Sequence, residues 1–156
     1  MRRKVKNRNI PGPDPKFDSV KLAKLINKVM WSGKKETARQ IVYGALDVIK
    51  TKLSVEDPLE TFDMAMKNAG PTMEVRSRRI GGANYQVPRE VRPERRQALA
   101  IQWIIDAARN KKGAPMAEKL ADELISASKN EGSAVKKRDD THKMADANKS
   151  FAHFSW

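Results

Sequence analysis

The segment TMEVRSRRIGGANYQVP, residues 72–88, departs from the pattern of the rest of the chain. Over positions 73–78 charged side chains alternate with less polar ones, which is the two-residue period of a β-strand. A second run, Tyr85-Gln86-Val87-Pro88, follows the turn residues Gly81-Gly82-Ala83-Asn84. Two such runs around a glycine-containing turn predict a β-hairpin. Because an isolated hairpin is marginally stable in water, this one is expected to pack on a helix, on a partner or on both.

On both sides of the hairpin the period changes to that of an α-helix. Apolar residues recur three or four positions apart, between capping residues, glycines and prolines. The sequence Asp57-Pro58-Leu59-Glu60 is the clearest start, because its aspartate can cap a helix, its proline suits the first position and its glutamate completes a capping box. Asp18-Ser19 and Gly132-Ser133 are expected to cap two further helices. The expected helices lie near residues 19–32, 38–53, 57–70, 92–108, 116–125 and 133–148.

These elements predict a mainly α fold, a single-domain bundle of about six helices with one protruding β-hairpin. A length of 156 residues suits one domain. A basic N-terminal arm is expected at residues 1–16, where three prolines and a glycine between positions 11 and 15 block regular structure. The helical domain should span residues 17–148, with the hairpin at about 72–88, and an aromatic C-terminal tail should span 149–156.

Positive charge is concentrated in three places. Of the formal net charge of +13, residues 1–16 hold +5, with six cations and one anion, and residues 76–96 hold +5, with seven arginines and two glutamates. Arg109, Lys111 and Lys112 add +3, so the remainder of the chain is neutral. Clusters that alone account for the excess are typical of phosphate-contacting surfaces. The alternative, a set of solvated charged faces, would spread the excess more evenly.

The hairpin arginines are the strongest candidate site. Strand alternation puts Arg76 and Arg78 on one face and Arg79, beside the turn, on the other. The hairpin could then keep three residues for packing, namely Val75, Tyr85 and Val87. Arginine pairs phosphate oxygens in a bidentate manner and stacks on bases. With no balancing acid expected nearby, RNA contact is preferred to the alternative of an edge strand charged against aggregation.

Catalytic and metal-binding chemistry is disfavoured. The chain has no cysteine, which excludes disulfides and cysteine-bound metals. Asp139, Asp140 and His142 are the nearest approach to a metal or acid–base cluster, but their spacing is not that of a zinc site. The segment Ser32-Gly33-Lys34-Lys35 lacks the first glycine of a phosphate loop, so RNA phosphate is the expected ligand of its lysines. We expect no catalytic residue, cofactor, metal or small-molecule substrate.

No apolar run approaches the roughly 20 residues of a membrane helix, and the basic N-terminus is not followed by the apolar stretch of a secretory signal. A cytoplasmic protein without a membrane partner is expected.

Trp31 and Trp103 fall beside apolar helical positions, so core packing is favoured over base stacking for both. In the fourth helix the expected core stripe is Ala98, Ile101, Ile105 and Ala108. The aromatic tail could stack on bases or dock onto the protein itself, and the sequence leaves both open.

Several blocks of the chain, in this order, resemble protein seven of the small ribosomal subunit in its bacterial form. The likeness extends from Pro15 to Trp156. Its most specific pieces are Gly33-Lys34-Lys35, Val75-Arg76-Ser77-Arg78-Arg79-Ile80-Gly81-Gly82, Tyr85-Gln86-Val87-Pro88, Val91-Arg92-Pro93-Glu94-Arg95-Arg96, Val135-Lys136-Lys137-Arg138 and Met144-Ala145-Asp146-Ala147-Asn148-Lys149.

The resemblance implies a structural, non-enzymatic protein that binds the 3′ major domain of small-subunit ribosomal RNA and nucleates assembly of the head. It also implies a hairpin that reaches toward the exit-site tRNA and the mRNA path, beside small-subunit proteins nine and eleven. The residues expected to bind rRNA are cations of the arm, of the Gly33-Lys34-Lys35 block, of the charge clusters and of the sixth helix: Arg2, Arg3, Lys4, Lys6, Arg8, Lys34, Lys35, Arg76, Arg78, Arg92, Arg95, Arg96, Arg109, Lys111, Lys136, Lys137 and Arg138. Those expected near tRNA and mRNA are Arg79, Gly81, Gly82, Asn84, Tyr85, Lys143 and Trp156.

Two other classes of protein share part of this pattern. An architectural DNA-binding protein would also be basic and helical, and competition between A-form RNA and duplex DNA distinguishes it. An enzyme acting on RNA would need paired acids, a metal site or a nucleophile, for which the sequence offers no convincing set.

Overall fold

The computed structural model describes residues 11–154, and the predictions for the first ten residues and for Trp156 lie outside that range. Six α-helices and one β-hairpin make up most of the described chain, which confirms the mainly α fold. The elements are α1 (Val20–Val29), α2 (Lys35–Leu53), α3 (Pro58–Ala69), β1 (Met73–Ile80), β2 (Ala83–Glu90), α4 (Pro93–Asn110), α5 (Met116–Ser128), α6 (Ser133–Ala147) and the 3₁₀ helix η1 (Lys149–Phe154).

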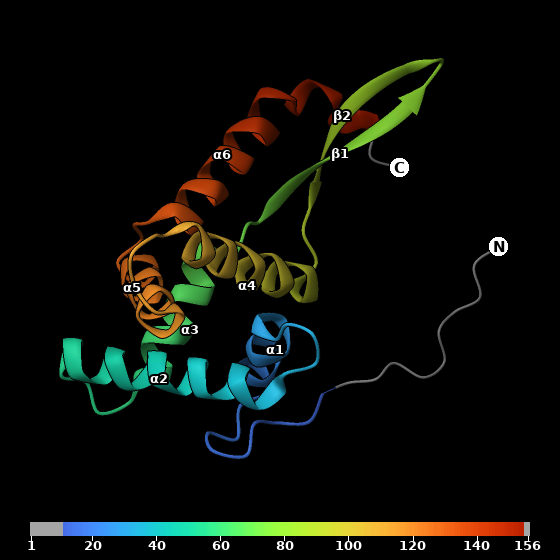
Figure 1. Ribbon diagram of the computed structural model, residues 1–156. Coiled ribbons are helices and arrows are strands. Elements are labelled where there is room, and N and C mark those ends of the chain that lie inside the picture. Colours follow the sequence, from blue (N-terminus) through green and yellow to red (C-terminus); the bar gives the residue numbers. More distant parts are fainter. Residues whose placement is uncertain (1–10, 155–156) are drawn as a thin grey trace.

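The helices form a compact body from which the hairpin projects. In Figure 1 α2 lies along one edge of the body, α6 extends from the opposite edge, and the hairpin runs outward beyond α4. The last part of the chain, η1, turns back from the end of α6 to the hairpin.

Of the three helix starts where the sequence predicts a cap, two follow the prediction and one does not. The Ser19 hydroxyl accepts from the Leu22 amide at 3.3 Å, and the Asp57 carboxylate accepts from the Leu59 amide at 2.8 Å, with a proline at the first helical position. Both predicted caps are confirmed. The exception is Ser133, which makes no capping bond, because Gly132 is the N-cap residue of α6 and its backbone lies in the positive-φ region at 94°.

The core is aliphatic and shared by all six α-helices. Its largest members are Leu22, Leu25, Ile26, Val42, Leu46, Ile49, Phe62, Ile104, Ile105, Leu120 and Leu124. On α4 the expected stripe is partly wrong, since Ala98 is exposed whereas Ala100 and Ile104 are buried. Trp103 packs against the edge of this core as predicted.

Trp31 does not join the core, contrary to the prediction. It is 72% exposed. The reason is a helix boundary: α1 ends at Val29, so Trp31 lies in the loop that follows and not on the apolar face of the helix.

The hairpin covers residues 73–90 and closes with a two-residue turn, shorter than the four-residue turn expected. Gly81 and Gly82 have φ angles of 57° and 92°, as a type I′ turn requires. The register pairs Arg76 with Val87 and Arg78 with Tyr85. Because residues directly opposite in an antiparallel pair point to the same face, Tyr85 and Val87 share a face with these arginines, and the expected separation of the two sets by face is wrong. Both residues nevertheless pack on the protein as expected, since Val87 is buried and Tyr85 contacts two aromatic rings.

The hairpin packs on α6 and on η1, which confirms that it is not left isolated. The Tyr85 ring lies 5.4 Å from the ring centre of Phe151 and 5.3 Å from that of Phe154. Arg78 donates from Nη1 to the Phe154 carbonyl at 2.6 Å. For the described part of the tail, docking onto the protein itself is therefore the observed arrangement.

The end of the predicted arm is attached to the body. Asp14 is buried and accepts hydrogen bonds from the Tyr43 hydroxyl of α2 at 2.8 and 2.9 Å. Its carboxylate also accepts from the Lys16 amide at 3.2 Å. Burial raises the pKa of Tyr43 above its ordinary value, and the hydrogen bond to Asp14 raises it further.

Candidate nucleic-acid interface

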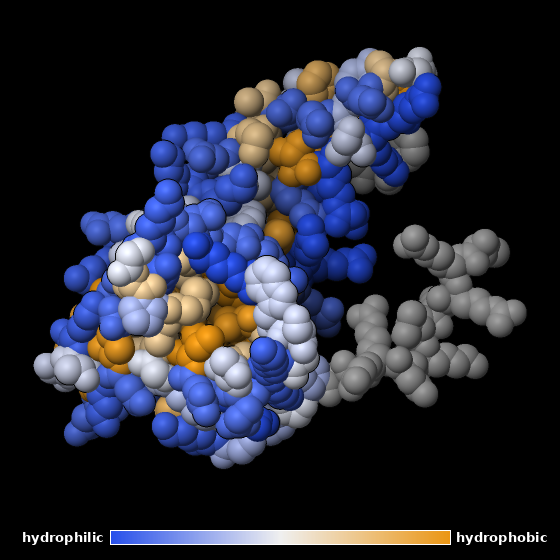
Figure 2. All heavy atoms as spheres, in the orientation of Figure 1, coloured by the Kyte–Doolittle hydropathy of each residue, from blue (hydrophilic) through white to orange (hydrophobic). Residues whose placement is uncertain are grey.

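The predicted cations divide into those that face solvent and those that bind the protein itself. Seven of the described candidates are exposed and have side chains that form neither an ion pair nor a hydrogen bond within residues 11–154: Lys34, Lys35, Arg79, Arg92, Lys136, Lys137 and Lys143. They lie at the start of α2, along the hairpin, at the start of α4 and on α6. Figure 2 shows mostly hydrophilic side chains over the hairpin, with a few apolar ones among them, and a larger group of apolar side chains on the body nearer α2 and α5.

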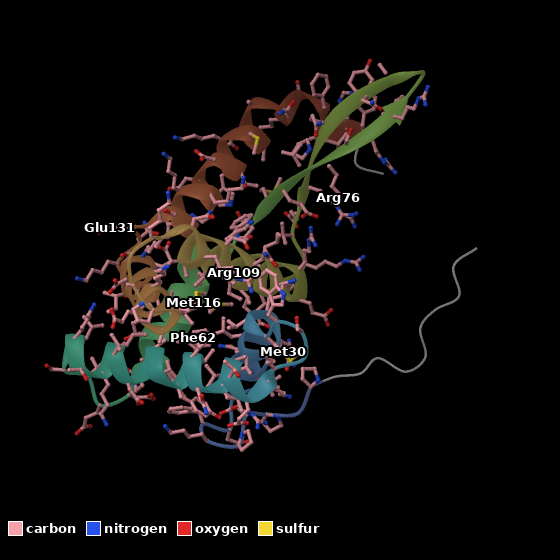
Figure 3. The ribbon with its side chains drawn as sticks, in the orientation of Figure 1. Met30, Phe62, Arg76, Arg109, Met116 and Glu131 are labelled. Carbon is pink, nitrogen blue, oxygen red and sulfur yellow. The ribbon has the colours of Figure 1, made fainter. Side chains whose placement is uncertain are left out.

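The richest grouping of arginines surrounds a hollow at the base of the hairpin. This hairpin-base hollow has a volume of about 240 Å³. It is lined by four arginines and two glutamates from β1, β2 and the start of α4: Glu74, Arg76, Arg89, Glu90, Arg92 and Arg95. Arg76 extends from the hairpin into solvent (Figure 3).

Glu74 organises this hollow. Its side chain is only 12% exposed, and its two oxygens accept from Arg76 Nε at 2.8 Å and Arg95 Nε at 3.3 Å. The expectation that no acid balances the hairpin arginines is therefore wrong. Each guanidinium has five N–H donors, so one bond to Glu74 fixes its position and leaves further donors for a phosphate. Arg89 and Arg92 add two exposed cations without ion pairs in the described chain.

Two of the predicted site residues are held by the tail. Arg78 is half-buried and bonded to the Phe154 carbonyl, and Tyr85 is enclosed by the two phenylalanines of η1. Both therefore fix the hairpin to the tail. At the tip, Gly81, Gly82 and Asn84 are exposed.

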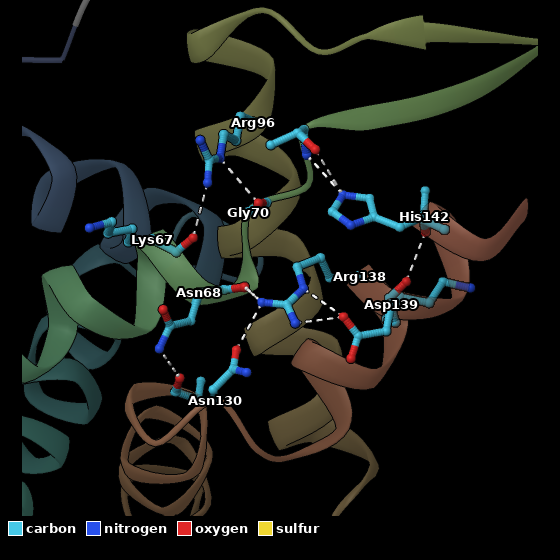
Figure 4. Close-up of polar contacts among 12 residues, drawn as sticks. Lys67, Asn68, Gly70, Arg96, Asn130, Arg138, Asp139 and His142 are labelled. Carbon is cyan, nitrogen blue, oxygen red and sulfur yellow. Dashed lines mark hydrogen bonds and ion pairs between the residues drawn. The ribbon is translucent and has the colours of Figure 1, made fainter. Parts of the chain in front are cut away.

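Arg96 and Arg138 bind backbone carbonyls at the end of α3. Arg96 donates from Nε to the Gly70 carbonyl at 3.1 Å and from Nη2 to the Lys67 carbonyl at 3.2 Å. Arg138 donates to the Asn68 carbonyl at 2.6 Å and pairs with Asp139, and its side chain is 17% exposed. Figure 4 shows both guanidinium groups reaching back to this helix end. Cations suit the last carbonyls of a helix, so these two arginines join elements of the fold.

Lys111 also serves the interior. Its ammonium lies 2.8 Å from Oε2 of Glu123, whose side chain is 1% exposed. The other carboxylate oxygen accepts from the Ala134 amide at 2.9 Å, in the first turn of α6. Glu123 thus replaces the missing side-chain cap of α6, and Lys111 neutralises it. Nothing in the spacing of the sequence singles out this buried glutamate.

Arg109 closes the end of α1. It donates to the Val29 carbonyl at 3.4 Å, and its guanidinium carbon lies 5.3 Å from the ring centre of Trp31. The residue is nevertheless exposed, so donors remain available to a partner. Two exposed residues were not among the predicted site residues. Arg89 was left out although it belongs to the charge cluster at 76–96, and Trp31 was assigned to the core.

No grouping that could hold a metal ion occurs among residues 11–154. Asp139 pairs with Arg138, and His142 accepts through Nε2 from the Thr72 amide at 3.0 Å, so these two residues make structural contacts. Across the same residues, no helix combines the length and the apolar character needed to cross a membrane.

Comparison with known proteins gives the family. The model of the ribosomal protein S7p/S5e family matches residues 1–149. The chain belongs to this family. Three bacterial relatives are named small ribosomal subunit protein uS7. That of Thermotoga neapolitana is 58% identical over 155 residues, covering 99% of both chains. That of Caldanaerobacter subterraneus is 59% identical over 144 residues, or 92% of each chain. That of Teredinibacter turnerae is 58% identical over 153 residues, 98% of this chain and 97% of its own.

Membership of the S7p/S5e family makes this chain a ribosomal protein. It is a structural constituent of the ribosome and not an enzyme, as the resemblance implied. The exposed cations of the hairpin, of α2 and of α6 therefore lie on the surface of an RNA-binding protein.

Proposed function

We propose that this protein binds the 3′ major domain of small-subunit ribosomal RNA and nucleates assembly of the head of that subunit. The coarser assignment follows from the family: the protein is a component of the small ribosomal subunit in the bacterial cytoplasm. The proposal adds which RNA it binds and which residues do so.

The observation that carries the proposal is the hairpin-base hollow. A carboxylate that is almost buried holds Arg76 and Arg95 on either side of it, while Arg89 and Arg92 complete the rim. Fixed guanidinium groups lose little side-chain entropy when they bind, and their planar donors match phosphate oxygens. RNA in its A-form is recognised largely by shape and through backbone contacts, which suits such a rim.

Other proposed rRNA contacts are exposed lysines of α2 and α6. Lys34 and Lys35 stand at the start of α2, whose N-cap makes no side-chain capping bond, so backbone N–H groups add to their attraction for phosphate. Lys136 and Lys137 are exposed on α6. Arg96, Arg138 and Lys111 are excluded from the proposed contacts because they bind the protein's own acceptors.

The hairpin tip is proposed to lie near the exit-site tRNA and the mRNA, beside small-subunit proteins nine and eleven. Its projection from the helical body supports this proposal (Figure 1). The residues concerned are Arg79, Gly81, Gly82 and Asn84 at the tip and Lys143 on α6, all exposed.

Directed cleavage of RNA tests both parts, because the chain has no cysteine and a single one can be introduced. An iron chelate attached to Asn84→Cys at the tip should cleave RNA near the exit site in reconstituted subunits, including bound tRNA. The same chelate on Glu118→Cys, in the first turn of α5, is the control. Footprinting of free rRNA by the unmodified protein should protect nucleotides of the 3′ major domain. Cleavage from Asn84→Cys that matches the control would disprove the placement of the tip, and a footprint elsewhere would disprove the rRNA assignment.

A further inference from the structure

Trp31 is the most exposed large apolar side chain among the described residues. Its backbone is fixed nonetheless. Ser32 and Gly33 adopt left-handed conformations with φ of 51° and 76°, and the Lys34 amide donates to the Trp31 carbonyl at 3.0 Å. On the other side, the Met30 amide donates to the Ile26 carbonyl at 2.9 Å. The loop therefore holds the indole outward in a defined position.

Arg109 covers one part of the indole and leaves the rest open. Its guanidinium carbon lies 5.3 Å from the ring centre, within the range of a cation–π contact. The bond from Arg109 to the Val29 carbonyl, at 3.4 Å, ties this guanidinium to the end of α1. Arg109 reaches this segment from α4, and it is labelled in Figure 3 together with Met30, the residue before Trp31. An aromatic ring that is oriented but unburied contributes little to the core and leaves its open part accessible to a partner.

The indole borders a hollow of about 500 Å³ between α1, the loop and α4. This volume lies in the range of small-ligand sites, about 300–1,000 Å³. Lys28 and Arg109 supply positive charge, the Asn27 and Gln102 side chains supply amides, and no acidic residue lines the hollow. The Asn27 side chain makes no hydrogen bond within residues 11–154, so both its donor and its acceptor remain available.

We infer that this hollow binds one unpaired nucleotide of RNA, whose base stacks on the open part of the Trp31 indole. Asn27 then hydrogen-bonds the edge of the base, and Lys28 pairs its phosphate. A nucleotide matches both the indole and the cations of the hollow, because its base has a π-face that stacks on the indole and its phosphate is an anion that pairs with a cation. An apolar peptide segment would leave both cations of the hollow without counter-charges. The inference rests on the proposed rRNA binding and adds a base-contacting site to surfaces that otherwise contact phosphates.

Substitution of Trp31 separates stacking from charge. Stacking of one base on an aromatic side chain corresponds to roughly 5- to 140-fold in affinity. Trp31→Ala should therefore weaken binding to a transcript of the 3′ major domain by about that factor, whereas Trp31→Phe, which keeps a ring, should weaken it less. Met64→Ala is the matched control, because Met64 is another exposed apolar side chain, 51% exposed, on α3. Thermal melting of each variant checks that all are folded.

Tryptophan fluorescence gives an independent reading. The difference between the wild-type and Trp31→Phe spectra isolates the emission of Trp31, and RNA should quench that difference signal. Unchanged affinity in Trp31→Ala overturns the inference whatever the fluorescence shows. If Trp31→Ala binds normally but the double variant Arg89→Ala, Arg92→Ala binds more weakly in the same assay, the proposed function is supported and the nucleotide site alone is rejected. A wild-type protein that does not bind the transcript refutes the proposed function itself.

Discussion

Lys111→Met distinguishes a structural cation from an RNA-binding one. Lys111 lies in the third positive cluster, but its ammonium is 2.8 Å from the carboxylate of Glu123, which also caps α6. Removing one partner of a buried ion pair costs about 3–5 kcal/mol. The Lys111 side chain is 33% exposed, so solvent screening reduces this, and we expect a loss of about 2–3 kcal/mol in the free energy of unfolding. For a domain of this size, that is a fall of roughly 4–12 °C in Tm.

The matched control is Lys112→Met, since Lys112 is exposed and forms no ion pair within residues 11–154. Thermal melting followed by far-UV circular dichroism measures the stability of each variant, and RNA titration well below both melting temperatures measures affinity. Lys111→Met should melt lower and bind RNA normally while folded. The reasoning is refuted if Lys111→Met melts with the wild type, or if it loses RNA affinity without losing stability.

Three further perturbations probe other parts of the structure. Burial and the hydrogen bond to Asp14 raise the pKa of Tyr43 in the folded state, so folding favours the neutral phenol, and this contribution to stability is fully present below about pH 10, the ordinary tyrosine pKa. It should be lost as pH rises through the raised pKa. Urea titrations of the Tyr43→Phe variant, which has no phenol to ionise, should show no such loss of stability. Leu124→Ala should cost about 2–5 kcal/mol through a core cavity and leave the RNA affinity of the folded protein unchanged, as melting and titration at low temperature would reveal. Phe154→Ala should release the ring of Tyr85, so amides of the hairpin should exchange hydrogen faster while those of α2 do not.

The fold was predictable where the signals are local. A cap such as Asp57, a proline at the first turn and a pair of glycines specify the conformation of the few residues around them. These signals placed the helices and the hairpin to within a few residues. Two of the errors in packing have small local causes. A helix that ends at Val29 moves Trp31 off the apolar face, and the register of the hairpin brings Tyr85 to the same face as Arg78.

The charge pattern did not predict which cations face solvent and which bind acceptors of the protein itself. Counting charges identifies clusters, but it does not tell whether a guanidinium faces solvent or a carbonyl group of another helix. Arg96 reaches carbonyls 26 and 29 residues away, and Arg138 reaches one 70 residues away. Glu123 looks like an ordinary charged residue of an amphipathic helix until the fold buries it beside α6. Such contacts depend on how the helices pack, which short-range periodicity does not contain.

The salt dependence of rRNA binding tests the central claim, that the exposed cations at the base of the hairpin contact phosphates. Arg89 and Arg92 are exposed and form no ion pair within residues 11–154, so their joint replacement by alanine should change Tm little. Each phosphate contact contributes about 0.7–0.9 to the slope of log affinity against log salt concentration. We expect the double variant to bind the 3′ major domain more weakly than the wild type, with a slope shallower by roughly 1.4–1.8. A folded double variant with the wild-type slope and affinity would contradict the assignment of this surface to RNA.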